Sequence, residues 1–427
     1  MQLLVSISFE QLMPAVKFHE GDAMTTKRRL FFATACLLSS FISASAADSQ
    51  SNQPVAAAVA VASSREWAIF GDQRHRLESD WDSRRPDGTL RDDRDRYRIR
   101  ARLGVEWKPT ENWMLRVRVR TGSHLRQQSS NLTLHDFDGG PNDDFDAVLD
   151  EWFVRGKFDR FSLWAGRNDF PFFYAAESQE MVWDNDPTLT GGFVSWKATD
   201  LLTVNVGVFA LPDGMDRWNG ALWAGQVVGR KKVRAGWTLK GAASFLDIEG
   251  GGQSDRLPDG NGSRDYRIGI LSAQSLWTLE QNPLRLGYCR LGVDGMRNFS
   301  DYSSTDSDPV TARYHNATDG LVAAFAVGKV KPDNRERGDW ELEYAYGHVE
   351  KLAVNASYAQ DDWVRWGTGG QATATDLKGH HVGLRAWLWK DKHHTLDLRA
   401  RTYFAASLSS VEDGNRFRLD LNYSFKL

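Results

Sequence analysis

Arginine alternates with apolar residues along two neighbouring segments, and this pattern constrains the fold more than any other feature. The first segment reads Arg-Tyr-Arg-Ile-Arg-Ala-Arg-Leu over residues 96–103, and the second reads Trp-Met-Leu-Arg-Val-Arg-Val-Arg over residues 113–120. Because the side chains of a β-strand point alternately to opposite faces, the two segments predict a hairpin with one apolar face and one face carrying seven arginines. In isolation, such a hairpin also fits a soluble β-sandwich with a solvated arginine face.

The composition narrows the class of protein. The chain of 427 residues is 41% hydrophobic and 26% charged, and its formal net charge is only −3. Beyond the N-terminus no apolar run is long enough for a spanning helix. Transmembrane barrels remain compatible with this composition, because their alternating strands are hydrophilic on average. The near balance of acidic and basic residues gives no indication of a nucleic-acid partner.

The N-terminus carries an export signal. A basic run at residues 27–29 precedes an apolar segment over residues 30–42, and small residues follow at 44–46. This order is typical of a secretory signal peptide, so residues 1–46 are assigned to one, with the true start expected at Met24. Cys36 is lost with the signal, which leaves Cys289 as the sole thiol and excludes an internal disulfide framework.

Short and long connections alternate along the remaining chain. Residues 47–65 are expected to form a flexible mature N-terminus, and residues 66–427 a single domain. Short polar turns are expected near residues 108–112, 157–160, 197–200, 229–232, 280–283, 329–339 and 390–392. Longer Gly-, Asp- and Ser-rich loops are expected near residues 83–93, 121–144, 168–188, 211–219, 248–264, 297–317, 350–377 and 408–415. The alternation predicts an all-β fold, a transmembrane antiparallel β-barrel of about sixteen strands with short periplasmic turns and long external loops.

The strand faces agree with a barrel in lipid. Apolar residues share one parity in the segments 113–120, 201–210, 233–240 and 416–427, with polar residues on the other parity. The segments 320–328 and 381–389 are apolar on both parities, and their second face is expected against a packed loop or a neighbouring subunit. Aromatic residues beside the short turns predict an interfacial girdle of Trp107, Trp113, Phe158, Phe161, Trp164, Trp196 and Trp277.

Two groups of motifs resemble the bacterial putative porin family, which is itself similar to the general porins. The first group is Trp-Ala-Gly-Arg at 164–167, a Pro-Phe-Phe loop, and Val-Trp-Asp-Asn-Asp-Pro at 182–187. The second is Gly-Asp-Trp-Glu at 338–341, Asp-Asp-Trp at 361–363 and Lys-Gly-His at 378–380. The chain departs from the usual barrel ending, because Lys426 and Leu427 follow the last aromatic residue, Phe425.

The resemblance covers roughly residues 66–427. It implies an outer-membrane porin of a Gram-negative bacterium that passes small hydrophilic solutes, contacts outer-membrane lipid and is inserted by the barrel-assembly machinery. A homotrimer is expected by analogy to general porins.

The charged residues suggest a pore with a transverse field. The loop at 168–188 follows the fifth expected strand, where general porins fold a loop into the lumen as a constriction. Its carboxylates are Asp169, Glu177, Glu180, Asp184 and Asp186. Strand parity places thirteen arginines on the lumen side of the first three and last two strands, namely Arg74, Arg76, Arg96, Arg98, Arg100, Arg102, Arg116, Arg118, Arg120, Arg399, Arg401, Arg416 and Arg418. An arginine wall opposite an acidic loop would favour anionic or zwitterionic solutes.

Other interpretations remain open. The arginines could instead pair with Asp and Glu across the lumen and fill a narrow barrel. The barrel could export an anionic polysaccharide of the alginate type, or serve an enzymatic or structural role. No nucleophile motif accompanies the paired histidines at 380–381 and 393–394, so we expect no enzyme, no catalytic residue and no cofactor. No metal site is assigned; calcium in the acidic loops around Asp255, Asp259 and Asp265, or around Asp301, Asp306 and Asp308, has only weak support from the residue spacing.

Overall fold

The computed structural model describes residues 66–176, 179–257, 264–279, 286–330, 335–363 and 374–427. The expected signal peptide and mature N-terminus lie outside these residues. The described chain forms one 17-stranded sheet and the short helix α2 (Pro309–Tyr314). Its strands are β1 (Glu66–Trp81), β2 (Arg94–Lys108), β3 (Trp113–Thr121), β4 (Leu132–Asp136), β5 (Ala147–Phe158), β6 (Phe161–Asn168), β7 (Leu189–Lys197), β8 (Leu202–Asp213), β9 (Arg217–Arg234), β10 (Trp237–Gly250), β11 (Tyr266–Thr278), β12 (Tyr288–Asn298), β13 (Asp319–Gly328), β14 (Trp340–Val349), β15 (Leu377–Lys390), β16 (His394–Ser407) and β17 (Asp413–Lys426).

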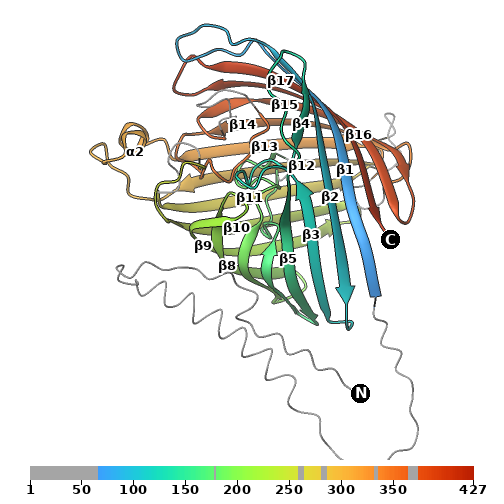
Figure 1. Cartoon of the computed structure of the whole chain (residues 1–427). Helices are drawn as coiled ribbons and strands as arrows, with labels where there is room; N and C mark the ends of the chain where they lie inside the picture. Colours follow the sequence, from blue (N-terminus) through green and yellow to red (C-terminus); the bar gives the residue numbers. More distant parts are fainter. Residues whose placement is uncertain (1–65, 177–178, 258–263, 280–285, 331–334, 364–373) are drawn as a thin grey trace, which may run out of the picture. The chain divides into compact units, whose positions relative to one another are not determined.

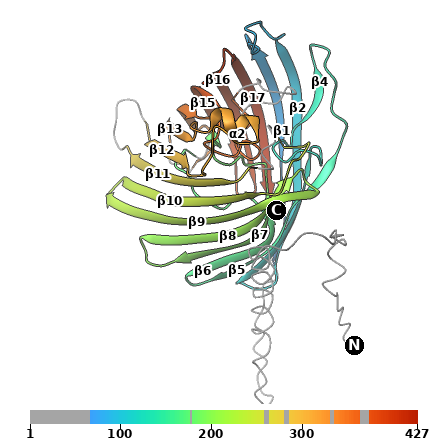
Figure 2. The ribbon, with the colours of Figure 1, turned by 90° about the vertical axis from the view of Figure 1, so that its left-hand side faces the viewer.

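The sheet closes on itself. Strand β1 pairs antiparallel with β2 on one side and with β17 on the other, so that Leu77 lies opposite both Tyr97 and Leu419. Figures 1 and 2 show β1 and β17 side by side at this closure. Closure pairs the strand edges that an open sheet would leave without hydrogen-bond partners. The expected antiparallel barrel is therefore confirmed.

Two strand segments share one position in the barrel. Strand β3 pairs with one half of β2, where Arg102 lies opposite Arg120, and β4 continues along the other half, where Ile99 lies opposite Leu132. Residues 122–131 leave the sheet between them. The seventeen strand segments thus occupy sixteen positions, which confirms the expected strand number.

One expected turn is wrong. Strand β9 runs without a break through residues 229–232, and Lys231 pairs with Leu239 of β10. The hairpin turn lies instead at residues 235–236, where Gly236 has a φ of +75°. Glycine adopts this left-handed conformation without a steric penalty, whereas the basic run before it only resembles a turn in polarity. The segment 233–240 is therefore the end of β9, a turn and the start of β10.

The outer face of the barrel is apolar, as the alternation predicts. Val117 and Val119 are 49% and 44% exposed, whereas Arg118 between them is buried on the inner face. Ring pairs lie beside the short turns, for example Trp67 with Trp107 at 5.3 Å between ring centroids. No helix within the described residues has the length and apolar character of a membrane span.

Trp164 was expected in the interfacial aromatic girdle, and this expectation is wrong. Its side chain is only 4% exposed, and its ring lies 5.6 Å from that of Phe209 and 6.0 Å from that of Phe193. It belongs to the parity of β6 that faces inward, so it packs inside the barrel rather than at a lipid interface.

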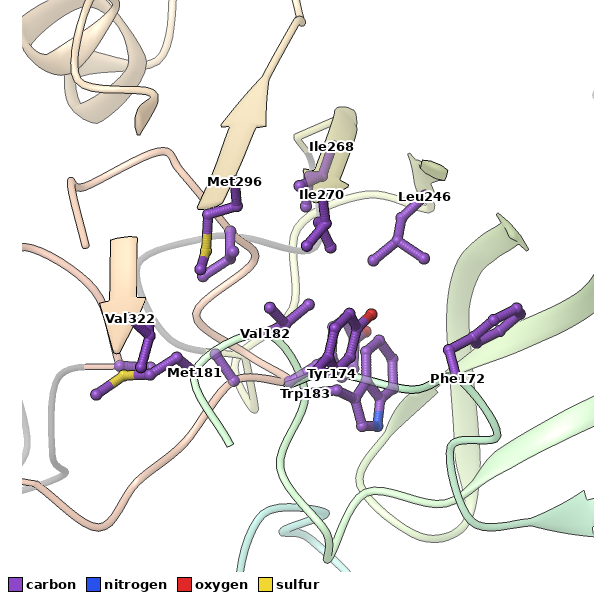
Figure 3. Close-up of a cluster of buried hydrophobic side chains, with 14 of the residues drawn as sticks. Phe172, Tyr174, Met181, Val182, Trp183, Leu246, Ile268, Ile270, Met296 and Val322 are labelled. Atoms are coloured by element: carbon purple, nitrogen blue, oxygen red, sulfur yellow. The ribbon is translucent and has the colours of Figure 1, made fainter. Parts of the chain in front are cut away.

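Three segments fold into the barrel and are called the inner loops: residues 122–131, 169–188 and 350–363. Parts of the expected external loops 121–144 and 350–377 thus lie inside, because residues such as Ser130 and Val354 are fully buried. Figure 3 shows Phe172, Tyr174 and Trp183 from the second inner loop near Leu246, Ile268 and Ile270 of the sheet. The inner face of β13 packs on the same loop through Val322, which confirms the packed-loop expectation for the segment 320–328.

Candidate functional site

All thirteen arginines singled out in the sequence lie on the inner face of five contiguous strands: β16, β17, β1, β2 and β3. We call this surface the arginine wall. It also contains Arg94, which the sequence analysis missed although it has the same parity in β2 as Arg96. The wall runs from one end of the barrel to the other. We call the end that carries the long loops the loop end and the end that carries the short turns the turn end.

Carboxylates are built into the wall itself. At the loop end, Glu78 is fully buried and contacts Arg96, Arg98 at 3.5 Å and Arg418 at 2.7 Å. Beside it, Asp80 contacts both Arg94 and Arg416, at 3.0 and 2.5 Å. Each carboxylate therefore holds two or three guanidinium groups in place.

The middle of the wall repeats the arrangement. Asp420 contacts Arg76 at 2.7 Å and Arg401 at 2.6 Å. Asp72 lies 2.7 Å from both Arg100 and Arg102. Arg74 is the more loosely held member, because it lies 3.8 Å from Asp420 and donates a hydrogen bond to the amide oxygen of Asn422.

At the turn end the partners come from the neighbouring strand β5. Arg118 contacts Asp150 at 2.8 Å and Glu151 at 2.6 Å, and Arg116 lies 2.7 Å from Glu151. Both carboxylates are almost fully buried. Further wall contacts join Arg120 to Asp150 and Arg399 to Glu343, each at 3.9 Å. Asp362 of residues 350–363 also contacts the wall, at Arg401 at 2.7 Å and at Arg418.

These contacts add carboxylates to the arginine wall that the sequence indicates. The wall is a ladder of mixed charge, and most of its ion pairs run between neighbouring strands rather than across the lumen. Arginines still outnumber carboxylates on the inner face of the five strands, where the acidic residues are Asp72, Glu78, Asp80, Glu106, Asp397 and Asp420. The net charge of the wall is therefore positive.

The second inner loop follows the fifth strand position and crosses the interior. Its two ends meet the wall, because Asp186 lies 3.9 Å from Arg100 and Asp169 lies 3.4 Å from Arg118. Between them, the backbone amide of Ala175 donates a hydrogen bond to Asp294 of β12 at 2.9 Å. The loop therefore spans from the wall to the opposite side of the barrel.

The loop carboxylates occupy different electrostatic environments. Burial raises the pKa of Asp186, but the charges of Arg100 and Arg120 outweigh this effect and lower it to about 2. In contrast, burial and the nearby carboxylates of Glu180 and Asp361 raise the pKa of Asp184 well above its usual value. Burial likewise raises the pKa of Glu180. Glu177 lies outside the described residues. Asp184 thus belongs to an acidic cluster and does not pair with the wall.

The three inner loops brace one another. Gln128 of the first loop donates hydrogen bonds to the carbonyl oxygens of Ala356 and Ala359 in the third, at 3.0 and 2.7 Å. Trp183 of the second loop stacks on Tyr358 of the third, with ring centroids 4.9 Å apart. The loops therefore form a packed unit inside the barrel rather than three independent segments.

Of the cavities that lie along the wall, two are lined by wall arginines from more than one strand. The outer cavity, of about 90 Å³, is lined by arginines of β2 and β17 together with Arg126, Arg256 and Asp361. The inner cavity, of about 390 Å³, is lined by Arg74, Arg100, Arg102 and Arg118 and by the second inner loop. Arg126 and Arg256 come from loops, so no strand periodicity could have indicated their position.

The other polar groups considered in the sequence have local roles. Asp308 accepts a hydrogen bond from the backbone amide of Thr311 at the start of α2 and pairs with Arg264 at 2.6 Å. Asp259 lies outside the described residues, within which no cluster of His, Cys, Asp and Glu forms a metal site. His380 contacts the Tyr344 hydroxyl at 2.8 Å on the outer face.

A closed antiparallel barrel with an apolar outer face and a charged interior is the architecture of an outer-membrane channel. Residues 49–240 match the model of the family described as putative porin, which confirms the resemblance found in the sequence. No protein of curated function matches the chain.

Two solved porin structures are similar to the chain. The high-pH structure of OprB from Pseudomonas putida has a TM-score of 0.52 at 14% sequence identity, over 84% of this chain and 94% of OprB. OmpF from Salmonella typhi, in a complex with daunomycin, has a TM-score of 0.49 at 13% identity, over 85% of this chain and 99% of OmpF. Family and fold together support a porin role rather than an enzymatic one, and they imply the outer membrane of a Gram-negative bacterium.

Proposed function

We propose that the barrel is a passive diffusion channel for small hydrophilic solutes and that its arginine wall gives it a preference for anions or zwitterions. The observation that carries this proposal is the continuity of the wall. Arginines line the outer cavity at the loop end and the inner cavity nearer the turn end, and Arg76, opposite Arg98, lies between the two groups. A solute that moves along this side of the barrel passes from one guanidinium group to the next.

The ion pairs within the wall suit passage rather than tight binding. A guanidinium group has five N–H donors, and a carboxylate on the neighbouring strand occupies only some of them. The side chains of Arg96, Arg98 and Arg102 are still 14%, 11% and 18% exposed beside their carboxylate partners, which leaves N–H donors open to the interior. Such donors can contact a passing anion, while the carboxylate nearby keeps the net attraction weak enough for release.

The alternative functions have less support. Export of a polysaccharide requires a bore wide enough for a polymer, whereas the three inner loops occupy the interior beside the wall. An enzymatic role requires a nucleophile or base near the loop end. His393 and His394 lie at the turn end, where β16 begins, and His381, nearer the loop end, is buried against Trp363 and Tyr403. We further propose that the apolar outer face contacts lipid, that the barrel-assembly machinery inserts the chain, and that it forms a homotrimer.

Electrical recording in planar lipid bilayers tests the proposal. Purified protein is added to a membrane that separates two potassium chloride solutions of different concentration, and the reversal potential gives the ratio of anion to cation permeability. The expected result is stepwise conductance with a preference for chloride. Absence of conductance would contradict the proposal that the barrel is a channel. A preference for potassium would contradict the proposal that the arginine wall makes the channel prefer anions.

A further inference from the structure

The inner cavity has two chemically different sides. One side is the arginine wall, represented by Arg74, Arg100, Arg102 and Arg118. The other side is formed by aromatic and aliphatic residues, namely Phe170, Phe172, Tyr174, Met181, Val182, Trp183, Met296 and Val322. A cavity that served only small inorganic ions would not require the second side, because apolar surface has no favourable contact with a hydrated ion.

The aromatic side is an ordered stack of rings. Phe170 lies 4.7 Å from Trp183 and 5.8 Å from Tyr174, with angles of 8° and 16° between the ring planes. Trp183 continues the stack onto Tyr358. Phe170 remains partly exposed although its neighbours are buried. A ring stacked against two others keeps its edge exposed, and the ring of a flat guest in the cavity can contact that edge.

A buried hydroxyl group without a partner lies on the same side. Tyr174 is 6% exposed, and its Oη atom has no hydrogen-bond partner among the described residues. Native proteins contain only a few buried polar groups without a hydrogen-bond partner, and each one calls for an explanation. In Figure 3 the Tyr174 ring lies beside Trp183, close to the apolar side chains of the cluster.

Four carboxylates also line the cavity, and each has a partner within the protein; Glu180 accepts a hydrogen bond from the side-chain amide of Asn185. Asp294 accepts hydrogen bonds from the backbone amides of Ala175 and Ala176, at 2.9 and 2.7 Å, so it serves to anchor the loop. Asp184 accepts a hydrogen bond from the backbone amide of Asp186 at 2.8 Å. Asp169 is more than half exposed and already pairs with Arg118.

We propose that the inner cavity is a binding site for small aromatic carboxylates on their way through the channel. The carboxylate contacts the guanidinium groups of Arg74 and Arg102, the ring lies against Phe170, and the Tyr174 hydroxyl group donates to a polar substituent of the solute. This inference rests on the proposed channel function and specifies the class of solute that the channel selects.

Three matched probes test the inference by isothermal titration calorimetry on the folded barrel in detergent micelles. Propanoate has the carboxylate without the ring, 3-phenylpropanoate has both, and phenylalanine adds an ammonium group. Burial of the ring is expected to lower the Kd of 3-phenylpropanoate about tenfold or more relative to propanoate. Equal affinity for these two anions overturns the aromatic site. Tighter binding of phenylalanine than of 3-phenylpropanoate would show that the site selects zwitterions, and it would overturn the proposal that the site selects anions.

Variants locate the site. Phe170→Leu is expected to reduce the ratio of the two anion affinities about 3- to 10-fold, whereas Phe145→Leu, in an exposed external loop outside the cavity, leaves the ratio unchanged. Equal ratios in Phe170→Leu and wild type overturn the assignment of the ring contact. Calorimetry does not require conductance, so its outcome is separate from the bilayer test: a conducting, anion-selective barrel without discrimination between the probes contradicts only this inference.

Discussion

Arg98 and Glu78 contact one another beside the outer cavity, and replacing each with glutamine is expected to shift ion selectivity in opposite directions. Arg98 is 11% exposed and lies 3.5 Å from Glu78, which is fully buried. Arg98→Gln removes a positive charge from the arginine wall, so the permeability for anions falls. Glu78→Gln removes a negative charge at almost the same place, so the permeability for anions rises.

The size of the shift follows from Coulomb's law. An ion about 5 Å from the altered charge gains or loses about 0.8 kcal/mol in water. Screening at roughly 0.1 M salt, where the Debye length is about 10 Å, leaves about 0.5 kcal/mol. This energy changes the occupancy of each ion about twofold, in opposite directions for anions and cations. The ratio of anion to cation permeability should therefore change about fourfold in each variant.

The two variants should differ in stability. In Arg98→Gln, Glu78 keeps its contacts with Arg96 and Arg418, so the free energy of unfolding should fall by less than about 1 kcal/mol. In Glu78→Gln, three guanidinium groups lose a buried partner, and the loss should be about 3–5 kcal/mol. Urea unfolding in lipid vesicles, followed by tryptophan fluorescence, measures the difference.

The assay is the reversal potential in a salt gradient, with Arg160→Gln as a control. Arg160 allows the same change of charge outside the five wall strands, in the short turn between β5 and β6, where its side chain is 62% exposed. The control should retain the wild-type ratio. A shift of the same sign in Arg98→Gln and Glu78→Gln, or no shift in either, would refute the role of wall charge in selectivity.

Further substitutions probe the wall, the inner loops and the outer face. Arg118→Gln should cost about 3–5 kcal/mol, more than Arg98→Gln, because it leaves Asp150 buried with a weaker partner; urea unfolding checks this order. Burial and neighbouring carboxylates raise the pKa of Asp184, so the stability that its proton provides is complete at acidic pH and is lost as pH rises through the folded-state pKa. Asp184→Asn should therefore stabilise the protein at neutral pH but not at acidic pH, as measured by thermal unfolding at both. Trp183→Ala should cost about 3–5 kcal/mol and increase single-channel conductance, because it removes the ring that joins two inner loops; unchanged conductance would contradict a constricting role. Leu103→Arg, on the outer face, should cost about 2–4 kcal/mol for a barrel in lipid vesicles, whereas a residue that faces water would show almost no cost.

The strand pattern could be predicted from the sequence because a period of two is a local property. The parity of the arginine runs, the even number of positions and the apolar outer face all follow from it. The carboxylates of the wall follow the same period of two along their strands. Asp72, Glu78 and Asp80 share the parity of Arg74 and Arg76 in β1, so the mixed charge of the wall was present in the sequence.

The inner loops could not be predicted in the same way, because their position depends on partners far away in the chain. Gln127 contacts the carbonyl oxygen of Ser357, 230 residues later. Nothing local to residues 122–131 distinguishes an inward segment from an external one, since both are polar and lack periodicity. The burial of Trp164 could not be predicted either. A tryptophan beside a short turn fits a lipid interface as well as the barrel interior until the parity of its strand is known.

The register of the barrel explains why the arginine wall needs its carboxylates. Arg74 lies opposite Arg100 on the neighbouring strand, and Arg76 lies opposite Arg98. Like charges in directly opposed positions destabilise a sheet, and the effect is larger in a partly buried interior. Asp72 and Asp420 offset this repulsion: Asp420 contacts Arg76 of β1 and Arg401 of β16, and Asp72 contacts Arg100 and Arg102 of β2. A wall with more unpaired arginines would attract anions more strongly but would oppose closure of the barrel at β1. Sheet stability therefore limits the positive charge of the wall, and the same limit keeps its sites weak enough for solutes to leave.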